Sequence, residues 1–388
     1  MFSSRVAGSL EPNRLTRGIR RSRASGRAIL DLTTTNPTAV GIAYPPSLLA
    51  ALADPAAAAA YQPAPLGMSG ARDAVSRDYR RRGIDLPAGR IVLTASTSEA
   101  YSILFKLLCE PAGDVVLTPV PSYPLFEHLT ALDGVRAVSY PLEYHGAWGI
   151  DVHTLDERWS AAVRAVLAVS PNNPTGSVLS AAEIDGLGRR CAERGAALII
   201  DEVFADYPLD PASGVIAARP APALTFRLGG LSKSVGLPQV KLGWIGVEGP
   251  DPLVAEALER LELICDTYLS VATPVQVAAP RLLEEGAVVR EAILARVRAN
   301  YAALGRLAAR APALDLLPAE GGWSAVMRVP AIRSEEDLVL DLLEREGVLV
   351  HPGFFFDFPH EAFLVVSLLP PVDQFEEGIL RAERVFPR

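Results

Sequence analysis

Between roughly residues 90 and 250 the sequence alternates short, almost wholly apolar runs with segments of helical pattern. Apolar runs without a polar face are typical of strands covered on both sides, as in a parallel sheet. Helical patterns at residues 98–108 and 181–194 separate some of them, which is the order of an α/β protein. We therefore predict a mostly parallel sheet flanked by helices, with its site at the carboxyl ends of the strands. The strand candidates are residues 91–95, 115–118, 136–140, 165–170, 197–201, 225–228 and 242–247.

After residue 250 the pattern changes to long helices rich in Ala, Leu, Glu and Arg, at residues 251–268 and 274–309. Shorter helical and strand pieces return beyond residue 315. We predict a large α/β domain at residues 46–285 and a smaller α+β domain built from both ends of the chain, residues 1–45 and 286–388.

The composition excludes several classes of protein. Apolar residues make up 49% and charged residues 21%, as in a folded globular chain. With a net charge of −8, the chain lacks the positive field that nucleic-acid binding requires. No apolar run approaches the roughly 18 residues of a membrane span. Three isolated cysteines indicate neither a disulfide framework nor a zinc site, so a reducing, cytoplasmic location is expected.

Common catalytic motifs are missing from the sequence. It has no GxGxxG after a strand, no phosphate-binding GxxxxGK[ST] and no GxSxG, which disfavours dehydrogenases, P-loop ATPases and simple serine hydrolases. The five histidines are scattered without a ligand spacing. We predict no metal site.

Lysine is rare in this chain, and its positions narrow the search for a reactive group. Only Lys106, Lys233 and Lys241 occur among 37 basic residues. A guanidinium cannot lose its proton to become a nucleophile, so a chain that otherwise uses arginine keeps lysine where a primary amine is needed.

Three polar motifs follow successive strand candidates. Residues 170–176 read Ser-Pro-Asn-Asn-Pro-Thr-Gly, Asp201 and Glu202 end the next strand, and Lys233 closes the Gly-Leu-Ser-Lys sequence after another. Taken singly, these are a helix-starting turn, a solvated cap and a surface pair. Together at successive strand ends they place an amide, a carboxylate and a primary amine around one crevice.

With these motifs in order, the chain resembles a pyridoxal 5'-phosphate enzyme of the fold type I superfamily, in the class I/II aminotransferase branch. The likeness extends from Asn36 and Pro37 to the last predicted strand. It implies that Lys233 forms an imine, or Schiff base, with the cofactor, because a lysine amine condenses with an aldehyde and can later move a proton. It also implies that Asp201 pairs with the pyridine nitrogen, which keeps the ring an electron sink.

The resemblance assigns the remaining cofactor contacts as well. Asn173 matches the amide that bonds the phenolic oxygen, and Tyr123 the aromatic side chain that stacks on the ring. Phosphate contacts are implied for Thr97, Ser98, Ser232 and Lys241; the first two begin a helix, where backbone N–H groups favour an anion. Tyr61 resembles the tyrosine that reaches the phosphate from a neighbouring subunit, which implies a homodimer.

Four positions depart from the family pattern. Lys241 replaces an arginine, Gly230 replaces a serine, and Phe204 replaces a tyrosine, although Tyr207 is nearby. Val365 occupies the place of the arginine that binds the substrate carboxylate in the last strand. We expect another arginine to bind that carboxylate from a different backbone position.

The resemblance implies an aminotransferase that moves an amino group between an amino acid and a 2-oxo acid, with a small-molecule amino donor and carbonyl acceptor as its partners. Val365 keeps two alternatives open, an aminotransferase for amines and a lyase, decarboxylase or synthase of the same fold. A non-catalytic ligand-sensing domain of a transcription regulator is a third, weakened because the short stretch before residue 28 would have to hold a DNA-binding domain.

Overall fold

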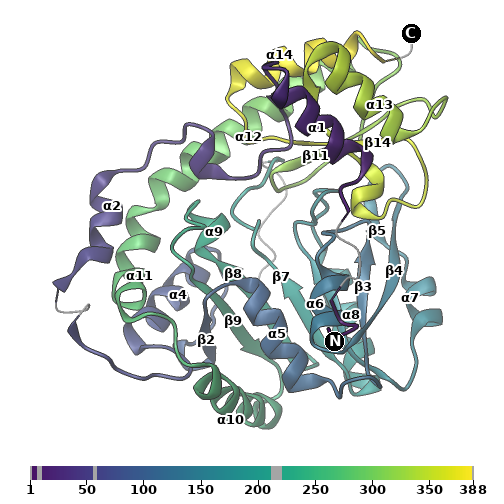
Figure 1. The fold of residues 1–388 in the computed structure, drawn as a ribbon. Helices are drawn as coiled ribbons and strands as arrows, with labels where there is room; N and C mark the ends of the chain where they lie inside the picture. Colours follow the sequence, from purple (N-terminus) through teal and green to yellow (C-terminus); the bar gives the residue numbers. More distant parts are fainter. Residues whose placement is uncertain (1, 7–10, 56–58, 211–220, 387–388) are drawn as a thin grey trace.

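A computed structural model describes residues 2–6, 11–55, 59–210 and 221–386 (Figure 1). Its centre is an eight-stranded sheet, and all seven predicted strand runs lie in it. The eighth strand, β5, was not predicted. In spatial order the strands are β2 (Ile91–Thr94), β9 (Gly243–Glu248), β8 (Thr225–Gly230), β7 (Ala197–Asp201), β6 (Val163–Val169), β3 (Val115–Val120), β4 (Arg136–Tyr144) and β5 (Trp148–Ile150).

The middle of this sheet is parallel. Strands β8, β7, β6, β3 and β4 run in one direction, whereas β9 is antiparallel to both of its neighbours and β5 is antiparallel to β4. The predicted mostly parallel sheet flanked by helices is therefore confirmed. Because the carboxyl ends of parallel strands meet at one edge, residues that follow β3, β6, β7 and β8 come together there.

Helices cover both faces of the sheet, and side chains along a strand alternate between them. In β3, Val116 packs with α5 (Thr97–Leu108) and α10 (Asp251–Tyr268), while Leu117 packs with α8 (Ala181–Arg194). Among the described residues, the other helices around this sheet are α4 (Ser69–Arg81), α6 (Phe126–Leu132), α7 (Val152–Arg158), α9 (Leu231–Ser234) and α11 (Thr273–Glu285), with α2 (Pro46–Ala50) and the 3-10 turns Pro37–Ala39, Ala51–Ala53 and Ala88–Arg90.

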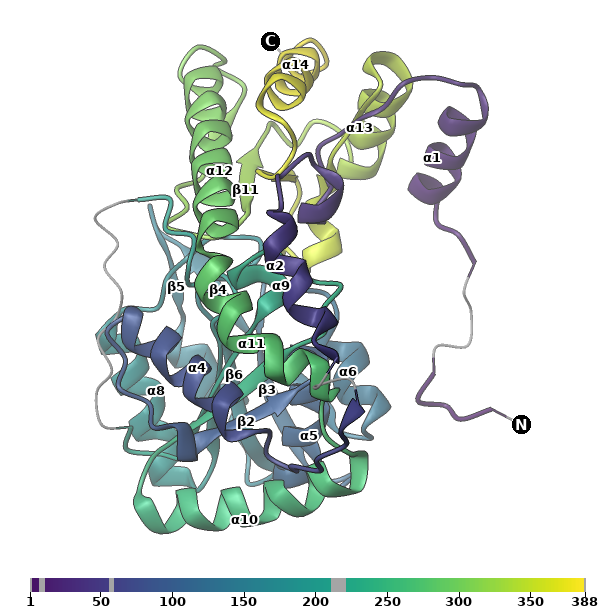
Figure 2. The ribbon, with the colours of Figure 1, turned by 90° about the vertical axis from the view of Figure 1, so that its left-hand side faces the viewer.

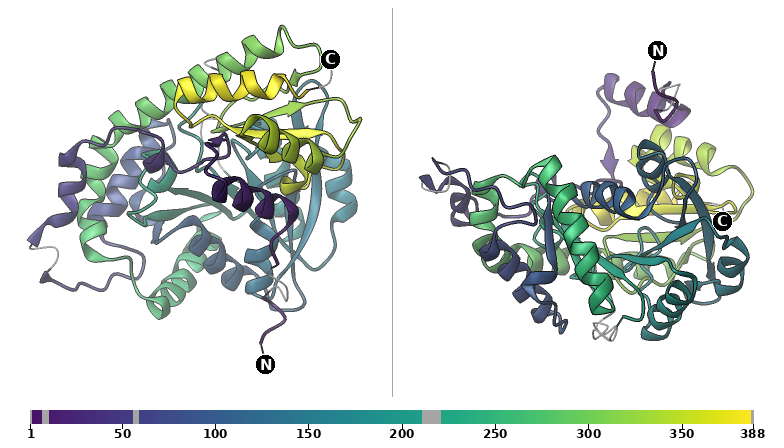
Figure 3. Two further views of the ribbon diagram at one scale, coloured as in Figure 1. Left: turned by 45° about the horizontal axis from the view of Figure 1, so that its top comes forward. Right: turned by 90° about the horizontal axis from the view of Figure 1, so that it is seen from below.

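A second, smaller sheet lies at the end of the molecule opposite α10 (Figure 2). Its antiparallel strands are ordered β10 (Asp315–Leu316), β11 (Ser324–Arg328), β14 (Phe363–Ser367) and β13 (His351–Pro352). The N-terminal β1 (Leu30–Asp31) pairs with β12 (Val348–Leu349). Figure 3 shows helices from both ends of the chain over these strands: α1 (Arg14–Ala24), α12 (Ala287–Ala308), α13 (Glu335–Asp341) and α14 (Val372–Glu383), with the π turn Leu342–Glu346 and the 3-10 turn Gly353–Phe356.

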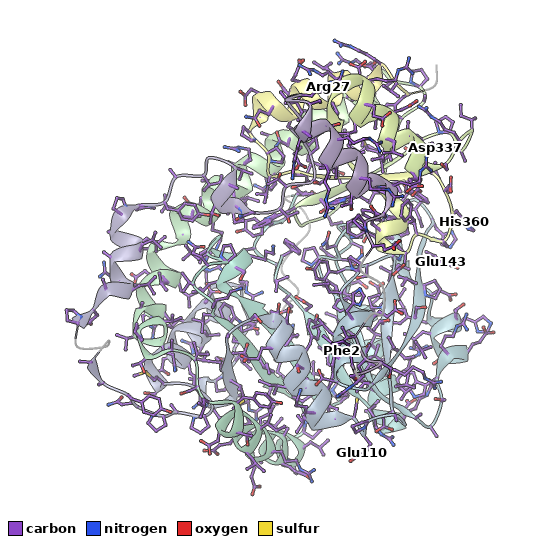
Figure 4. The ribbon with its side chains drawn as sticks, in the orientation of Figure 1. Phe2, Arg27, Glu110, Glu143, Asp337 and His360 are labelled. Carbon is purple, nitrogen blue, oxygen red and sulfur yellow. The ribbon has the colours of Figure 1, made fainter. Side chains whose placement is uncertain are left out.

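The N-terminal segment runs along the outside of the molecule. Arg5 donates to the carbonyl of Leu132, the last residue of α6, and Arg14 on α1 pairs with Glu336 and Asp337 in the first turn of α13. In Figure 4, Phe2 lies in front of the region of the large sheet, whereas Arg27, Asp337 and His360 lie around the small sheet. Across the described ranges, no helix combines the length and apolar character that a bilayer span requires.

The helices agree with the sequence patterns except at one point. α8 and α10 cover residues 181–194 and 251–268 as predicted, and α5 begins one residue earlier than expected. The pattern at residues 274–309 instead forms two helices, α11 and α12, which meet at Gly286. The chain passes close to Val235 there, since a Cβ on Gly286 would lie 2.7 Å from Val235 Cγ1.

Arg227 on β8 provides a test of this packing. Its guanidinium contacts the carboxylates of Glu202 and Glu248, and its side chain is only 5% exposed. Arg227→Met should lower the free energy of unfolding by about 3 to 5 kcal/mol, because the carboxylate of Glu248 loses its partner and that of Glu202 keeps the more distant Arg82, at 3.7 Å. Arg260→Ala, which breaks an exposed pair with Glu256, should cost below about 0.5 kcal/mol. Urea denaturation measures the free energy of unfolding of both variants. Equally small losses in the two would contradict a stabilising role for the buried pairs of Arg227.

Candidate active site

A cavity of about 300 Å³ lies where the parallel strands of the large sheet end. All of the predicted site residues except Tyr61 line it: Thr97, Ser98, Tyr123, Asn173, Asp201, Ser232, Lys233 and Lys241. Tyr61 lies outside this lining and is 71% exposed. The motifs that follow separate strands in the sequence thus meet around one space.

The start of α5 forms one wall of the cavity. The Ser96 hydroxyl accepts a hydrogen bond from the N–H of Glu99, so Ser96 is the N-cap and Thr97 and Ser98 form the first turn. Gly243 at the start of β9 passes close by, and a Cβ there would lie 2.9 Å from the Ser96 carbonyl carbon and 3.1 Å from the Thr97 nitrogen. The wall therefore presents a helix N-terminus, which attracts an anion.

Lys233 on α9 projects between two aromatic side chains. Its Nζ lies 5.6 Å from the ring centroid of Phe204 and 5.0 Å from that of Trp323. Burial lowers the pKa of this amine to about 8, and the negative charge of Asp201 opposes that effect. A buried amine of this kind loses its proton far more readily than a solvated lysine.

Tyr207 fixes the backbone that carries Lys233. Its hydroxyl donates to the Lys233 carbonyl at 2.5 Å and lies 3.3 Å from the Ser234 carbonyl. The tyrosine near Phe204 therefore bonds the main chain of α9 and is not among the residues lining the cavity. At position 204 the cavity meets a phenyl ring with no hydroxyl.

Asp201 ends β7 and is only 7% exposed. Its Oδ2 accepts a hydrogen bond from the Tyr101 hydroxyl at 2.6 Å, and its Oδ1 accepts one from the Val203 N–H at 3.0 Å. Burial raises the pKa of Asp201 to about 6, and these two donors oppose the rise. Tyr101 was not predicted from the sequence as a site residue, although it stands one helical turn after Thr97.

Asn173 faces the cavity with its amide held from the small sheet. The hydroxyl of Ser324 on β11 donates to Asn173 Oδ1 at 3.1 Å, which leaves the amide Nδ2 as a donor for a ligand. Ser324 and the neighbouring Trp323 both line the cavity. The sequence pattern predicted a strand here, but neither residue was predicted to belong to the site.

Two of the departures from the family pattern have a local structural setting. A Cβ at Gly230 would lie 3.1 Å from the Leu242 carbonyl oxygen, so a serine has little room there. Lys241 lines the cavity with its backbone in the left-handed region, at φ 62°, where a non-glycine residue is uncommon.

Val365 lies in an apolar cluster and is not among the residues that line the cavity. It is 1% exposed and packs with Leu317, Val326, Phe356 and Phe358. Of the described residues that line the cavity, none is an arginine, so this lining does not contain the predicted substitute for the missing carboxylate-binding arginine. Lys233 and Lys241 are the cations of that described lining.

The fold and the site together define an α/β enzyme with a buried primary amine, a buried carboxylate and an anion-binding helix end in one cavity. A model of the family "Aminotransferase class I and II" matches residues 65–376. The chain belongs to this family, as the resemblance implied, and it is an aminotransferase.

Named relatives match over most of their length. Glutamate-pyruvate aminotransferase AlaA of Haemophilus influenzae is 28% identical over 374 residues, covering 92% of this chain and 91% of that protein. Alanine aminotransferase of Mycobacterium tuberculosis is 27% identical over 365 residues, covering 90% and 83%. The solved structure of alanine aminotransferase from Pyrococcus furiosus superposes with a TM-score of 0.88 at 22% identity, covering 99% of both chains, and shows the same fold.

The environment of Lys233 predicts an unusual pH dependence. In the protein without cofactor, its acetylation by acetic anhydride should reach half its maximal rate near pH 8, because the amine reacts only when unprotonated. Asp201→Asn should move this midpoint lower, since it removes the negative charge that favours the ammonium form. Peptide mapping at each pH measures the rate. A midpoint near 10.5, the ordinary lysine value, would contradict the described burial.

Proposed function

We propose that this aminotransferase uses pyridoxal 5'-phosphate, bound through Lys233, and moves an amino group between an α-amino acid and a 2-oxo acid. The observation that carries the proposal is that Lys233, Asp201 and the start of α5 all line one cavity. The names of the relatives, glutamate-pyruvate and alanine aminotransferases, favour small amino acids as donors and 2-oxo acids as acceptors.

The described residues fit each part of this cofactor. The N-terminus of α5, with Thr97 and Ser98, suits the phosphate, and Ser232 and Lys241 supply a hydroxyl and a positive charge beside it. Asp201 suits a protonated ring nitrogen, the Nδ2 of Asn173 suits the phenolic oxygen, and the Tyr123 ring suits the face of the pyridine. The bound cofactor would act as an electron sink for the bonds at the substrate Cα.

Lys233 has two roles in this proposal. Its amine would hold the cofactor aldehyde, and when the substrate amine displaced it, the free Lys233 amine could take up the proton of the substrate Cα. A pKa of about 8 suits both roles, because the amine is partly unprotonated near neutral pH. Phe204 and Trp323 shield this amine from water.

Asp201 holds a proton on the ring nitrogen. With a pKa of about 6 it is mostly ionised at pH 7, and its two donors, Tyr101 and Val203, orient the carboxylate. Because this charge is buried, its attraction for a cationic ring is stronger than it would be in water.

A specific observation favours a second candidate, an aminotransferase for primary amines. The place of the carboxylate-binding arginine holds Val365, packed among apolar side chains. The described lining of the cavity holds no arginine, so a substrate carboxylate bound there would lose water without a bidentate partner. An amine without an α-carboxylate avoids that cost.

We also infer a homodimer in the cytoplasm, with Tyr61 reaching the phosphate of the neighbouring subunit. The exposure of this aromatic side chain outside its own cavity supports an intermolecular role. The three described cysteines are buried and unlinked, which fits a reducing compartment. A catalytically competent monomer would contradict the role of Tyr61.

The cofactor proposal predicts one labelled lysine. Borohydride treatment of the holoenzyme should fix the cofactor to Lys233 as a secondary amine, which peptide mapping identifies by mass. The Lys241→Arg variant should give the same labelled peptide, because it keeps a cation for the phosphate. A label on Lys106 or Lys241 of the unaltered protein would overturn the assignment.

Matched substrates separate the two candidates. Alanine and ethylamine, or phenylalanine and phenethylamine, differ only in the α-carboxylate, so their kcat/KM ratios isolate its contribution. If α-amino acids are the substrates, each should exceed its amine by at least about 10-fold, since one charge-assisted hydrogen bond contributes roughly 1.5 to 3 kcal/mol. A preference for the amines would favour the second candidate.

A further inference from the structure

Tyr101 is the side chain whose hydroxyl bonds Asp201, at 2.6 Å. We propose that Tyr101 is a positioning residue, whose hydroxyl holds Asp201 charged and oriented so that the carboxylate keeps a proton on the ring nitrogen of the cofactor. The inference rests on the proposed function, because it needs a cofactor ring opposite Asp201. It adds a residue that the sequence motifs did not include.

The surroundings of Tyr101 hold its hydroxyl in place. The side chain is 3% exposed, and its ring packs edge-on against Phe126 at 5.4 Å and stacks on Phe105 at 6.1 Å. A ring packed on two sides has little rotamer freedom, so its O–H stays directed at the carboxylate.

One helix joins this hydroxyl to the wall that suits the phosphate. Tyr101 follows Thr97 by four residues on α5, so the two side chains lie on the same face, one turn apart. The first turn of α5 presents backbone N–H groups to the cavity, and the second presents the phenol to Asp201. A shift of α5 would therefore disturb both ends of the cofactor site together.

The charges around Asp201 give the hydroxyl its importance. Burial is the main effect on this carboxyl and raises its pKa to about 6, and the Tyr101 hydrogen bond is the strongest opposing contribution. Glu202 raises the pKa further, and Lys233 lowers it. Without the hydroxyl, Asp201 would bind a proton more readily and would compete with the ring nitrogen for it.

The phenol itself stays protonated. Burial, the charge of Asp201 and a smaller effect of Tyr123 raise the pKa of Tyr101 well above 10. The Tyr101 hydroxyl therefore keeps its proton throughout the neutral pH range and acts as a fixed hydrogen-bond donor.

The test uses holoenzyme loaded with pyridoxal 5'-phosphate that carries nitrogen-15 in its ring, because the nitrogen-15 chemical shift reports protonation of that atom. In Tyr101→Phe the resonance at pH 7.5 should move from the pyridinium position toward neutral pyridine. The kcat should fall roughly 10- to 100-fold, which is the loss expected for a hydrogen bond to a charged group, whereas KM should change little.

The matched control is Tyr140→Phe. Tyr140 is also fully buried, and its hydroxyl donates to the Leu167 carbonyl at 2.8 Å, away from the cavity. This variant also loses one buried phenol hydroxyl and its hydrogen bond, here to a main-chain carbonyl. It therefore measures how much a less stable fold alone changes kcat and the nitrogen-15 shift. It should leave the nitrogen-15 shift unchanged and kcat within about twofold.

Two further proteins keep the test decisive. In the Asp201→Ala background, adding Tyr101→Phe should cause no additional loss of kcat, because the hydroxyl acts only through that carboxylate. If Tyr101→Phe does not fold, 3-fluorotyrosine at position 101 replaces it. This near-isosteric residue is a stronger donor, and it should raise the pH at which the nitrogen-15 resonance leaves the pyridinium position.

The outcomes separate this inference from the proposed function. If borohydride labels Lys233 but Tyr101→Phe does not move the nitrogen-15 resonance and the fluorinated protein does not change the pH at which it leaves the pyridinium position, the role of Tyr101 is wrong and the cofactor site stands. If the unaltered protein takes up no pyridoxal 5'-phosphate on Lys233, the proposed function itself fails. Equal effects of Tyr101→Phe and Tyr140→Phe would also overturn the positioning role.

Discussion

The site depends on two opposite charges that the fold holds in a largely dry environment. Asp201 ends β7 and Lys233 follows the neighbouring parallel strand β8. Burial raises the pKa of the carboxyl and lowers that of the amine, so it favours the neutral form of each. Such groups are costly unless donors or a ligand compensate them. Tyr101 and Val203 donate hydrogen bonds to the carboxylate of Asp201. The Lys233 amine lies beside the rings of Phe204 and Trp323, which offer it no hydrogen bond of that kind, so it is the group of the pair that stays available to react.

The departure from the family pattern at position 204 changes the surroundings of Lys233. Position 204 lacks a hydroxyl, but its phenyl ring packs edge-on against Trp323, which completes the aromatic wall around Lys233. The nearby tyrosine bonds the backbone of Lys233 instead. Phe204 thus supplies an aromatic face beside the Lys233 amine, while the Tyr207 hydroxyl fixes the main chain that carries it.

The sequence allowed prediction of features that depend on local pattern. The apolar strand runs were sufficient because strands covered on both faces admit few polar residues. The predicted helix at residues 181–194 was also correct; Ser180 and Glu183 form a capping box at its start, and the left-handed Gly195 ends it. Tyr101 and Ser324 were missed because their roles arise only when α5 and β11 pack against strands distant in the sequence. The division at Gly286 was missed for the same reason, since the close approach to Val235 is a tertiary contact.

The charges of the cavity limit how a substrate can be recognised. Among the described lining residues the cations are Lys233 and Lys241, and the anion is Asp201. A phosphate at the start of α5 would engage Lys241, a ring nitrogen would engage Asp201, and the cofactor aldehyde would engage Lys233. This lining then has no cation left to pair with a substrate carboxylate, so recognition within it must use the second N–H of the Asn173 amide and hydroxyls such as that of Thr35, since the Ser324 hydroxyl already donates to Asn173. Neutral donors of this kind bind a carboxylate more weakly than a bidentate arginine does, and they discriminate less against substrates that lack one.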